Sequence, residues 1–279
     1  MTRTKVSIQE LQQRKLDGKT FSMITVYDYP MASLVEQSDI EVILVGDSLG
    51  MVIQGLESTV PVNLEDIIYH LKCVRRGAPN TFVVGDMAFL SYQVNKDEAI
   101  RNAGLLLKAG ADCVKMEGGL DIVETVRAVV RAGIPVMGHI GLTPQTAGAL
   151  GGFKVQGKSR DAAQRLLNDA VALERAGVFA MVLECVPAPL GKCINETLSI
   201  PTIGCGAGAS VTAQNLNAYD ILGIFQRFVP KFVEQHAQIG KEIIEAFNSW
   251  AGTVSSGAYP AERHCFTMNE EDVPEGPTI

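Results

Sequence analysis

Eight short runs of aliphatic and β-branched residues recur along the chain, most of them bounded by Gly, Pro or Asp. Apolar runs of this length with turn-forming flanks are typical of strands that are buried on both faces. We therefore expect strands at 21–27, 41–47, 81–87, 112–117, 134–140, 179–185, 200–204 and 221–225.

Segments with the apolar spacing of amphipathic helices lie between most of these runs, at 63–77, 97–110, 120–133 and 160–177. Gly110, Gly133 and Gly177 end three of them and are expected to take the left-handed conformation that stops a helix. Asn63 is the expected N-cap of the first. A further helix is expected over 230–250, packed outside the core or against another subunit.

Strand, helix and glycine stop repeat in a way that is typical of parallel βα units. A doubly wound sheet and a (βα)₈ TIM barrel both fit this pattern. Eight units in about 250 ordered residues favour the barrel, and no GxGxxG fingerprint follows the first strand. We expect one barrel domain over 1–266 with an outer C-terminal helix, and a disordered acidic tail over 267–279 because that segment has few apolar residues.

Charge and cysteine content exclude several classes of protein. The 24 Lys and Arg against 31 Asp and Glu give a net charge of −7, which argues against nucleic-acid binding. The six cysteines form no CxxC pair, which favours a reducing compartment. Because no apolar stretch approaches about 18 residues, the chain is expected to be cytoplasmic and not bound to membrane.

Polar residues interrupt the ends of strands two to six, where a (βα)₈ barrel places its active site. They are Asp47 with Ser48, Asp86, Lys115 with Glu117, His139 and Glu184. Because these ends converge on one mouth of a barrel, we expect the side chains to meet.

Three carboxylates that meet in a buried space repel one another and cost several kcal/mol unless a cation or protons compensate. Asp47, Asp86 and Glu117 therefore indicate a divalent metal, and all-oxygen ligation favours Mg²⁺. The aspartates can instead cap the following helices, and Glu117 can instead pair with Lys115 on the same face of its strand. An unpaired Glu184 inside an apolar strand favours a general base.

Two further features allow more than one interpretation. His139 fits either a satisfied core histidine or a hydrogen-bond donor to substrate. The run GCGAGAS (204–210) fits either a tight turn after a strand or an anion site at the start of a helix.

Longer strings around these residues carry a resemblance. VGDSLGM (45–51), GHIGLTPQ (138–145), GGFKVQGKS (151–159) and LECVP (183–187) are similar to segments of the ketopantoate hydroxymethyltransferase family, as are strings in the same order from 25–32 to 256–266. The resemblance covers nearly the whole chain and implies a TIM barrel of the phosphoenolpyruvate/pyruvate-binding type.

The resemblance also implies an activity and residue roles. A hydroxymethyl group would pass from 5,10-methylenetetrahydrofolate to 3-methyl-2-oxobutanoate, giving 2-dehydropantoate, in the first step of pantothenate synthesis. Asp47 and Asp86 would hold Mg²⁺ and thereby the substrate, with Glu117 as the third acidic group. Ser48 and Lys115 would contact the substrate, and Glu184 would accept its proton. The family forms homo-oligomers, described as decamers.

The chain departs from the family pattern between 209 and 220, where Thr212-Ala213 and Tyr219 replace the usual Asp-Gly and His. This places folate contacts or helix packing in question more than the proton chemistry. Two other functions remain open. One is another barrel enzyme of the phosphoenolpyruvate mutase and isocitrate lyase type that cleaves or rearranges a 2-oxo acid, although no cysteine here matches the catalytic cysteine usual in that group. The other is a non-catalytic oxo-acid binding protein.

Overall fold

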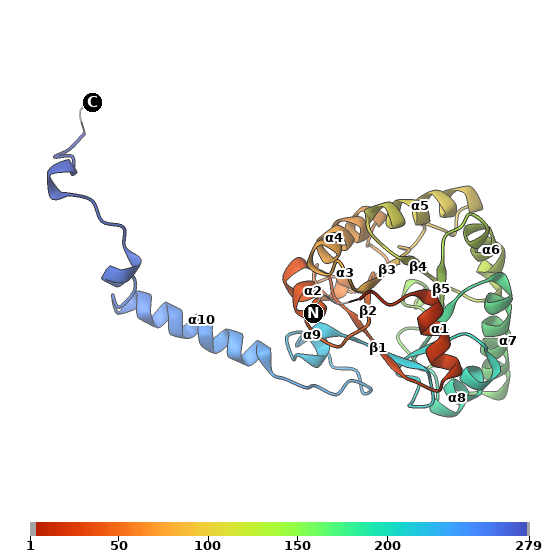
Figure 1. The fold of residues 1–279 in the computed structure, drawn as a ribbon. Helices are drawn as coiled ribbons and strands as arrows, with labels where there is room; N and C mark the ends of the chain where they lie inside the picture. The colour runs from red at the N-terminus through yellow and green to blue at the C-terminus, as the bar shows by residue number, and fades with distance from the viewer. Residues whose placement is uncertain (1–3, 278–279) are drawn as a thin grey trace.

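A computed structural model describes residues 4–277, and its centre is a closed barrel of eight parallel strands in sequence order (Figure 1). Each strand pairs with the next, and β8 pairs with β1 to close the barrel. The expected TIM barrel is therefore confirmed. The strands are β1 (Phe21–Thr25), β2 (Val42–Val45), β3 (Phe82–Asp86), β4 (Cys113–Glu117), β5 (Val136–Gly141), β6 (Ala180–Glu184), β7 (Thr202–Cys205) and β8 (Ala213–Asn217).

All of the helices lie outside the strands of the barrel (Figure 1). They are α1 (Ile8–Leu16), α2 (Tyr29–Glu36), α3 (Leu49–Val52), α4 (Leu64–Gly77), α5 (Lys96–Ala109), α6 (Val123–Arg131), α7 (Arg160–Ala176), α8 (Ala188–Thr197), α9 (Ala218–Ile221) and α10 (Ile239–Ser255). Short 3₁₀ helices occupy Leu120–Ile122, Pro144–Thr146, Glu262–His264 and Glu270–Asp272. Residues 206–212 join β7 to β8 without a helix, so the glycine-rich segment 204–210 offers no helix N-terminus to an anion.

The expected caps define the helix ends. Asn63 is the N-cap of α4, and its backbone N–H donates to Asp66 Oδ2 at 2.9 Å. Gly110 and Gly177 end α5 and α7 with φ of +116° and +103°, a region that favours glycine. Gly133 also has positive φ, but it lies one residue beyond the cap of α6.

The position expected for the eighth strand was wrong. Residues 221–225 form the end of α9 and the turn after it, whereas β8 spans Ala213–Asn217. The apolar run ILGIF suggested a buried strand, while AQNLN carries polar side chains at three of its five positions. Asn215 lies on the inner face of the barrel, where its Oδ1 is 3.3 Å from Thr25 Oγ1. A strand whose inner face is polar does not have the apolar signal of the other seven.

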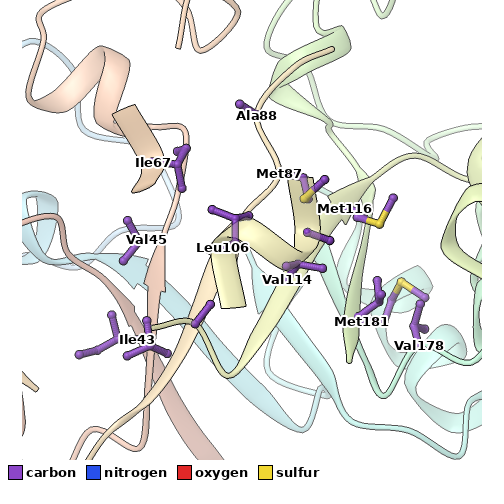
Figure 2. Packing of buried hydrophobic residues seen from close by; sticks show 14 of the residues in the cluster. Ile43, Val45, Ile67, Met87, Ala88, Leu106, Val114, Met116, Val178 and Met181 are labelled. Carbon is purple, nitrogen blue, oxygen red and sulfur yellow. The ribbon is translucent and has the colours of Figure 1, made fainter. Parts of the chain in front are cut away.

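Alternation along each strand divides the core into two apolar clusters. The outward-facing residues, which include Ile43, Val114 and Met116, pack against helix residues such as Ile67 and Leu106 (Figure 2). The inward-facing residues fill the barrel, and they are Phe21, Met23, Val42, Leu44, Phe82, Val84, Cys113, Met137, Phe179, Ala180, Val182, Ile203 and Ala213. Helix α1 contributes Leu11 to this inner cluster and so covers the N-terminal end of the barrel.

Helix α10 extends away from the barrel instead of packing on it (Figure 1). It begins later than the expected segment 230–250, and its apolar side chains are exposed: Ile244 by 50%, Phe247 by 66%, Trp250 by 60% and Val254 by 46%. The domain boundary at residue 266 stays a prediction. Within the described residues, no helix has the length and apolar character to cross a bilayer, and all six cysteines are free thiols.

Replacement of Leu11 by Ala should lower the free energy of unfolding by about 2–5 kcal/mol, because it removes a fully buried side chain and leaves a cavity beneath the barrel. Leu16→Ala on the same helix is the matched control, since Leu16 is 73% exposed, and it should change stability little. Chemical denaturation followed by circular dichroism measures both. Equal effects of the two substitutions would mean that α1 does not close the barrel.

Candidate active site

The polar residues expected at the strand ends meet inside the C-terminal end of the barrel. Residues of β4 alternate, so that Lys115 and Glu117 face inward and Met116 faces the helices, as expected from the sequence. The same alternation turns inward the side chains at the ends of neighbouring strands, which are Asp86 on β3, His139 on β5 and Glu184 on β6. Asp47 follows β2 and is also buried.

Asp47, Asp86 and Glu117 form an acidic cluster, in which one carboxylate oxygen of each lies within 4.8 Å of the others. Asp86 Oδ2 accepts a hydrogen bond from the Asp47 backbone N–H at 3.0 Å. Neither aspartate caps the helix that follows it, because α3 begins after Ser48 and α5 after Asn95. The capping alternative is therefore excluded.

The negative charge of the acidic cluster is only partly compensated by neighbouring positive groups. Burial, together with the charges of Asp86 and Glu117, raises the pKa of Asp47 well above its usual value. Burial also raises the pKa of Asp86, although Lys115 opposes this. Asp86 Oδ1 is buried, and the ammonium of Lys115 lies 3.0 Å from it as an ion-pair partner. A hard divalent cation fits such a group of oxygen donors.

Lys115 is the principal positive charge beside the cluster. Its Nζ lies 3.0 Å from Asp86 Oδ1 and 2.9 Å from Glu117 Oε1. Burial opposes a charge on this ammonium, but Asp86, Glu117 and Asp47 outweigh it and raise the pKa of Lys115 well above its usual value. The pairing of Glu117 with Lys115 is therefore present together with the acidic cluster and is not an alternative to it.

His139 connects the cluster to Glu184. Its Nδ1 lies 3.2 Å from Glu117 Oε1 and 3.1 Å from Lys115 Nζ, while its Nε2 lies 3.4 Å from Glu184 Oε2 without hydrogen-bond geometry. Burial and Lys115 oppose a charge on the ring, but Glu117 and Glu184 outweigh them and raise the pKa of His139 to about 9. The imidazolium and Lys115 then share Glu117 Oε1 as acceptor.

The same two cations act on Glu117. Burial pushes the pKa of Glu117 upward, yet Lys115 and His139 lower it to about 2. Glu117 is consequently ionised throughout the physiological range, with Oε1 occupied by two cationic donors.

Glu184 is the most accessible of these carboxylates, with 20% of its side chain exposed. The backbone around it is tightly constrained, because Leu142 N donates to Glu184 O at 2.8 Å. Gly141 pairs with Glu184 across β5 and β6 and has φ of +99°. A Cβ at position 141 would lie 2.2 Å from Glu184 O, so only glycine fits there.

Sequence reasoning missed two residues of the site, Gln145 and Tyr92. Gln145 Nε2 donates to Asp47 Oδ2 at 3.0 Å and to Met87 O at 2.8 Å, and its backbone N–H donates to Glu117 Oε2 at 3.2 Å. The Tyr92 hydroxyl donates to Gln145 Oε1 at 2.8 Å. Gln145 holds two members of the acidic cluster in place. The one available signal was its position at the end of GHIGLTPQ, in the loop that follows β5.

Ser48 lies at the edge of the site, after β2, and its hydroxyl is 2.8 Å from the Tyr27 hydroxyl. The atypical segment 209–220 supplies β8 and α9. Thr212 lies at the N-terminal end of β8, opposite the mouth, where it bonds to Asn195 and Thr202. Tyr219 lies near the mouth and donates to Asp28, the N-cap of α2.

This arrangement combines an oxygen-donor set for a divalent cation, an ammonium beside it and an accessible carboxylate next to an imidazolium. Together these groups can bind an anionic, oxygen-rich molecule and remove a proton from it.

Comparison with solved structures supports the fold. Phosphonopyruvate hydrolase superposes with a TM-score of 0.62 at 12% identity, covering 96% of this chain and 93% of that one. The superposition with 2,3-dimethylmalate lyase, a member of the phosphoenolpyruvate mutase/isocitrate lyase superfamily, has a TM-score of 0.58 at 14% identity and covers 96% of this chain and 92% of that one. At these identities the likeness concerns the barrel alone.

Comparison of sequences identifies the family. The family model for ketopantoate hydroxymethyltransferase matches residues 5–262. The chain is 58% identical over 268 residues to 3-methyl-2-oxobutanoate hydroxymethyltransferase of Heliobacterium modesticaldum, covering 96% of this chain and 97% of the relative. It is 49% identical to the enzyme of the same name from Clostridium botulinum, covering 96% and 98%. The chain therefore belongs to the ketopantoate hydroxymethyltransferase family.

Proposed function

We propose that this chain transfers a hydroxymethyl group from 5,10-methylenetetrahydrofolate to 3-methyl-2-oxobutanoate and so serves pantothenate biosynthesis. The observation that carries the proposal is the buried acidic cluster with Glu184 on the other side of His139. Family membership supplies the substrate class, and the geometry supplies the groups that the chemistry needs.

Asp47, Asp86 and Glu117 are the residues that would hold Mg²⁺. The three carboxylate oxygens within 4.8 Å of one another and the raised pKa of Asp47 both support a cation at this place. Glu117 Oε1 already contacts Lys115 and His139, so the two aspartates would hold the cation while Glu117 would supply a further negative charge beside it. When bound, the cation polarises the 2-oxo group and stabilises the negative charge that develops on its oxygen.

Lys115 and Ser48 bind the carboxylate of the substrate. The Lys115 ammonium is fixed by Asp86 and Glu117, and its charge is retained because its pKa is raised. The Ser48 hydroxyl lies at the edge of the acidic cluster, because a Cβ built at Gly46 would be 3.2 Å from Ser48 Oγ and 3.6 Å from Asp86 Oδ2. A charged donor and a neutral donor together hold the carboxylate in one orientation.

Glu184 accepts the proton from C3 of the bound 2-oxo acid. Its partial exposure leaves it accessible to substrate, and His139 Nε2, 3.4 Å from Glu184 Oε2, lies beside it. The resulting C3 carbanion equivalent forms the new carbon–carbon bond to the one-carbon unit of the folate. Both carbon–nitrogen bonds of the folate methylene bridge break: one opens to give an iminium whose carbon accepts the electron pair from C3, and the other breaks when water supplies the hydroxyl oxygen. The proton taken from C3 and the second proton of water end on the two folate nitrogens.

We further propose that the chain is a homo-oligomer in which a second copy covers α10. Ile244, Phe247, Trp250 and Val254 recur at helical spacing and form one exposed apolar stripe on a helix that leaves its own barrel. An apolar stripe of this kind is typical of a surface buried by a partner chain. The decameric number, the cytoplasmic location, and the expectation of no nucleic-acid or membrane partner stay predictions.

Asp47→Asn should stabilise the metal-free protein and abolish its stabilisation by Mg²⁺. The folded-state pKa of Asp47 is raised, so the folding penalty appears as pH rises above the unfolded value of about 4 and is complete above the folded value. The gain in melting temperature measured in EDTA should therefore be larger at pH 8 than at pH 5, by about 2–4 °C for each kcal/mol relieved. Asp39→Asn on the exposed surface is the control, and an equal Mg²⁺ response in Asp47→Asn and the unaltered chain would refute the metal assignment.

Glu184→Gln should abolish exchange of the C3 proton of 3-methyl-2-oxobutanoate in deuterated water, lowering the rate by about 10²–10⁴-fold. Proton NMR with Mg²⁺ and without folate measures this half-reaction, and Glu196→Gln on the exposed face of α8 is the control. Absence of exchange in the unaltered protein would indicate a non-catalytic binding protein. Turnover of the 2-oxo acid that does not depend on folate would instead indicate a lyase or mutase.

Phe247→Asp combined with Trp250→Asp should dissociate the oligomer, because the charges would be buried against the partner copy. Ser249→Asp adds charge on the opposite face of α10 and should leave the assembly intact. Sedimentation velocity gives the mass of each. A monomeric unaltered chain, or an assembly unchanged by the double substitution, would exclude α10 as the interface.

A further inference from the structure

Three hydroxyl and amide side chains form a hydrogen-bonded chain at the mouth of the barrel, next to the acidic cluster. They come from strands that are neighbours in the closed sheet: Asn217 ends β8, Tyr27 follows β1 and Ser48 follows β2. Asn217 Nδ2 lies 2.5 Å from the Tyr27 hydroxyl, which lies 2.8 Å from Ser48 Oγ.

The direction of the first hydrogen bond is fixed by the helix that follows β8. Asn217 is the N-cap of α9, and its side-chain oxygen accepts from the Tyr219 backbone N–H at 3.0 Å. A backbone N–H can only donate, so the amide atom that faces it must be the oxygen. The amide nitrogen therefore faces Tyr27, and it can only donate.

The second hydrogen bond takes its direction from the first. A phenol has one proton, and since the Tyr27 oxygen accepts from Asn217, that proton points to Ser48 Oγ. Burial raises the pKa of Tyr27 well above its usual value, so the phenol keeps its proton. The residue is also held by its backbone, because Tyr27 O lies 2.7 Å from His70 Nδ1.

Ser48 Oγ consequently acts as acceptor toward Tyr27, and its own proton remains for another acceptor. We propose that Asn217 and Tyr27 are positioning residues that orient the Ser48 hydroxyl as a hydrogen-bond donor to the carboxylate of the 2-oxo acid. This inference rests on the proposed role of Ser48 in substrate binding.

The donor-to-acceptor direction of these two hydrogen bonds matters because the Ser48 hydroxyl is otherwise free to rotate. If Asn217 did not donate a hydrogen bond to the Tyr27 oxygen, the Ser48 hydroxyl could donate to that oxygen instead. Ser48 would then face the substrate with its lone pairs only. Two oxygen acceptors facing each other repel, whereas a donor preset toward a carboxylate gains a charge-assisted hydrogen bond without reorganisation. Asn217 lies within the segment 209–220, where the protein sequence departs from the family's usual pattern. The residue that sets the direction of these hydrogen bonds therefore belongs to the atypical segment.

Asn217→Asp reverses the polarity while it preserves the cap of α9. One aspartate oxygen still accepts from Tyr219 N–H, since Asp and Asn are equally good N-caps, but the other now accepts from the Tyr27 hydroxyl. The phenol proton then turns away from Ser48. Binding of 3-methyl-2-oxobutanoate with Mg²⁺, measured by isothermal titration calorimetry, should weaken about tenfold or more. Asn168→Asp on the exposed face of α7 adds the same charge and should not change the affinity.

A double-substitution cycle separates positioning from general damage. Ser48→Ala should weaken binding to a similar extent, and Asn217→Asp should add little in the Ser48→Ala background, because the hydroxyl that it orients is gone. In C3 exchange, KM should rise while kcat changes far less, since Glu184 is untouched. If Asn217→Asp does not fold, Asn217→Ser keeps a capping oxygen, removes the donor to Tyr27 and should weaken binding in the same direction.

The outcomes distinguish the two proposals. If the unaltered chain does not bind the 2-oxo acid, or Ser48→Ala binds it normally, the proposed site is wrong. If Ser48→Ala weakens binding while Asn217→Asp and Asn217→Ser do not, the site stands and the positioning role is overturned. Additive losses in the double substitution would likewise overturn it.

Discussion

Burial of several carboxylates in one end of a barrel is the constraint on which the site depends. Asp47, Asp86 and Glu117 are nearly inaccessible, and isolated charges in such surroundings are strongly unfavourable. Lys115 and His139 offset part of this charge through contacts with Glu117, but Asp47 and Asp86 keep raised pKa values. The protein therefore folds around a charge imbalance, which is typical of a site arranged for a ligand rather than for stability.

The barrel can hold this imbalance because its other end is apolar. Strand alternation gives the inner surface a single set of side chains, and these change from aliphatic near the N-terminal ends to ionisable near the C-terminal ends. Leu11 of α1 is buried against the apolar end and covers it. The low dielectric below the site strengthens the interactions of Lys115 and Glu117 above it.

Much of this could be predicted from sequence. Seven of the eight strands lie within one to two residues of the expected runs, and the inward direction of Lys115 and Glu117 followed from a period of two. The failure at β8 has a physical cause: Asn215 and Asn217 make its inner face polar, and an apolar turn nearby gave a stronger signal. The contact of Gln145 with Asp47 joins residues 98 positions apart through a loop, and spacing along the chain carries no information about such contacts. Likewise, the donor direction of Asn217 depends on Tyr219 N–H, a backbone group that no residue pattern reveals.

The placement of Glu184 depends on the absence of a Cβ atom at Gly141. The Glu184 carbonyl occupies the volume that any other residue's first side-chain carbon would need. The carbonyl is fixed there by Leu142 N–H, so neither strand can yield without moving the carboxylate. Any side chain at position 141 is therefore expected to displace Glu184, so that in a mutational survey of the chain this position would be grouped with Glu184 rather than with the other glycines.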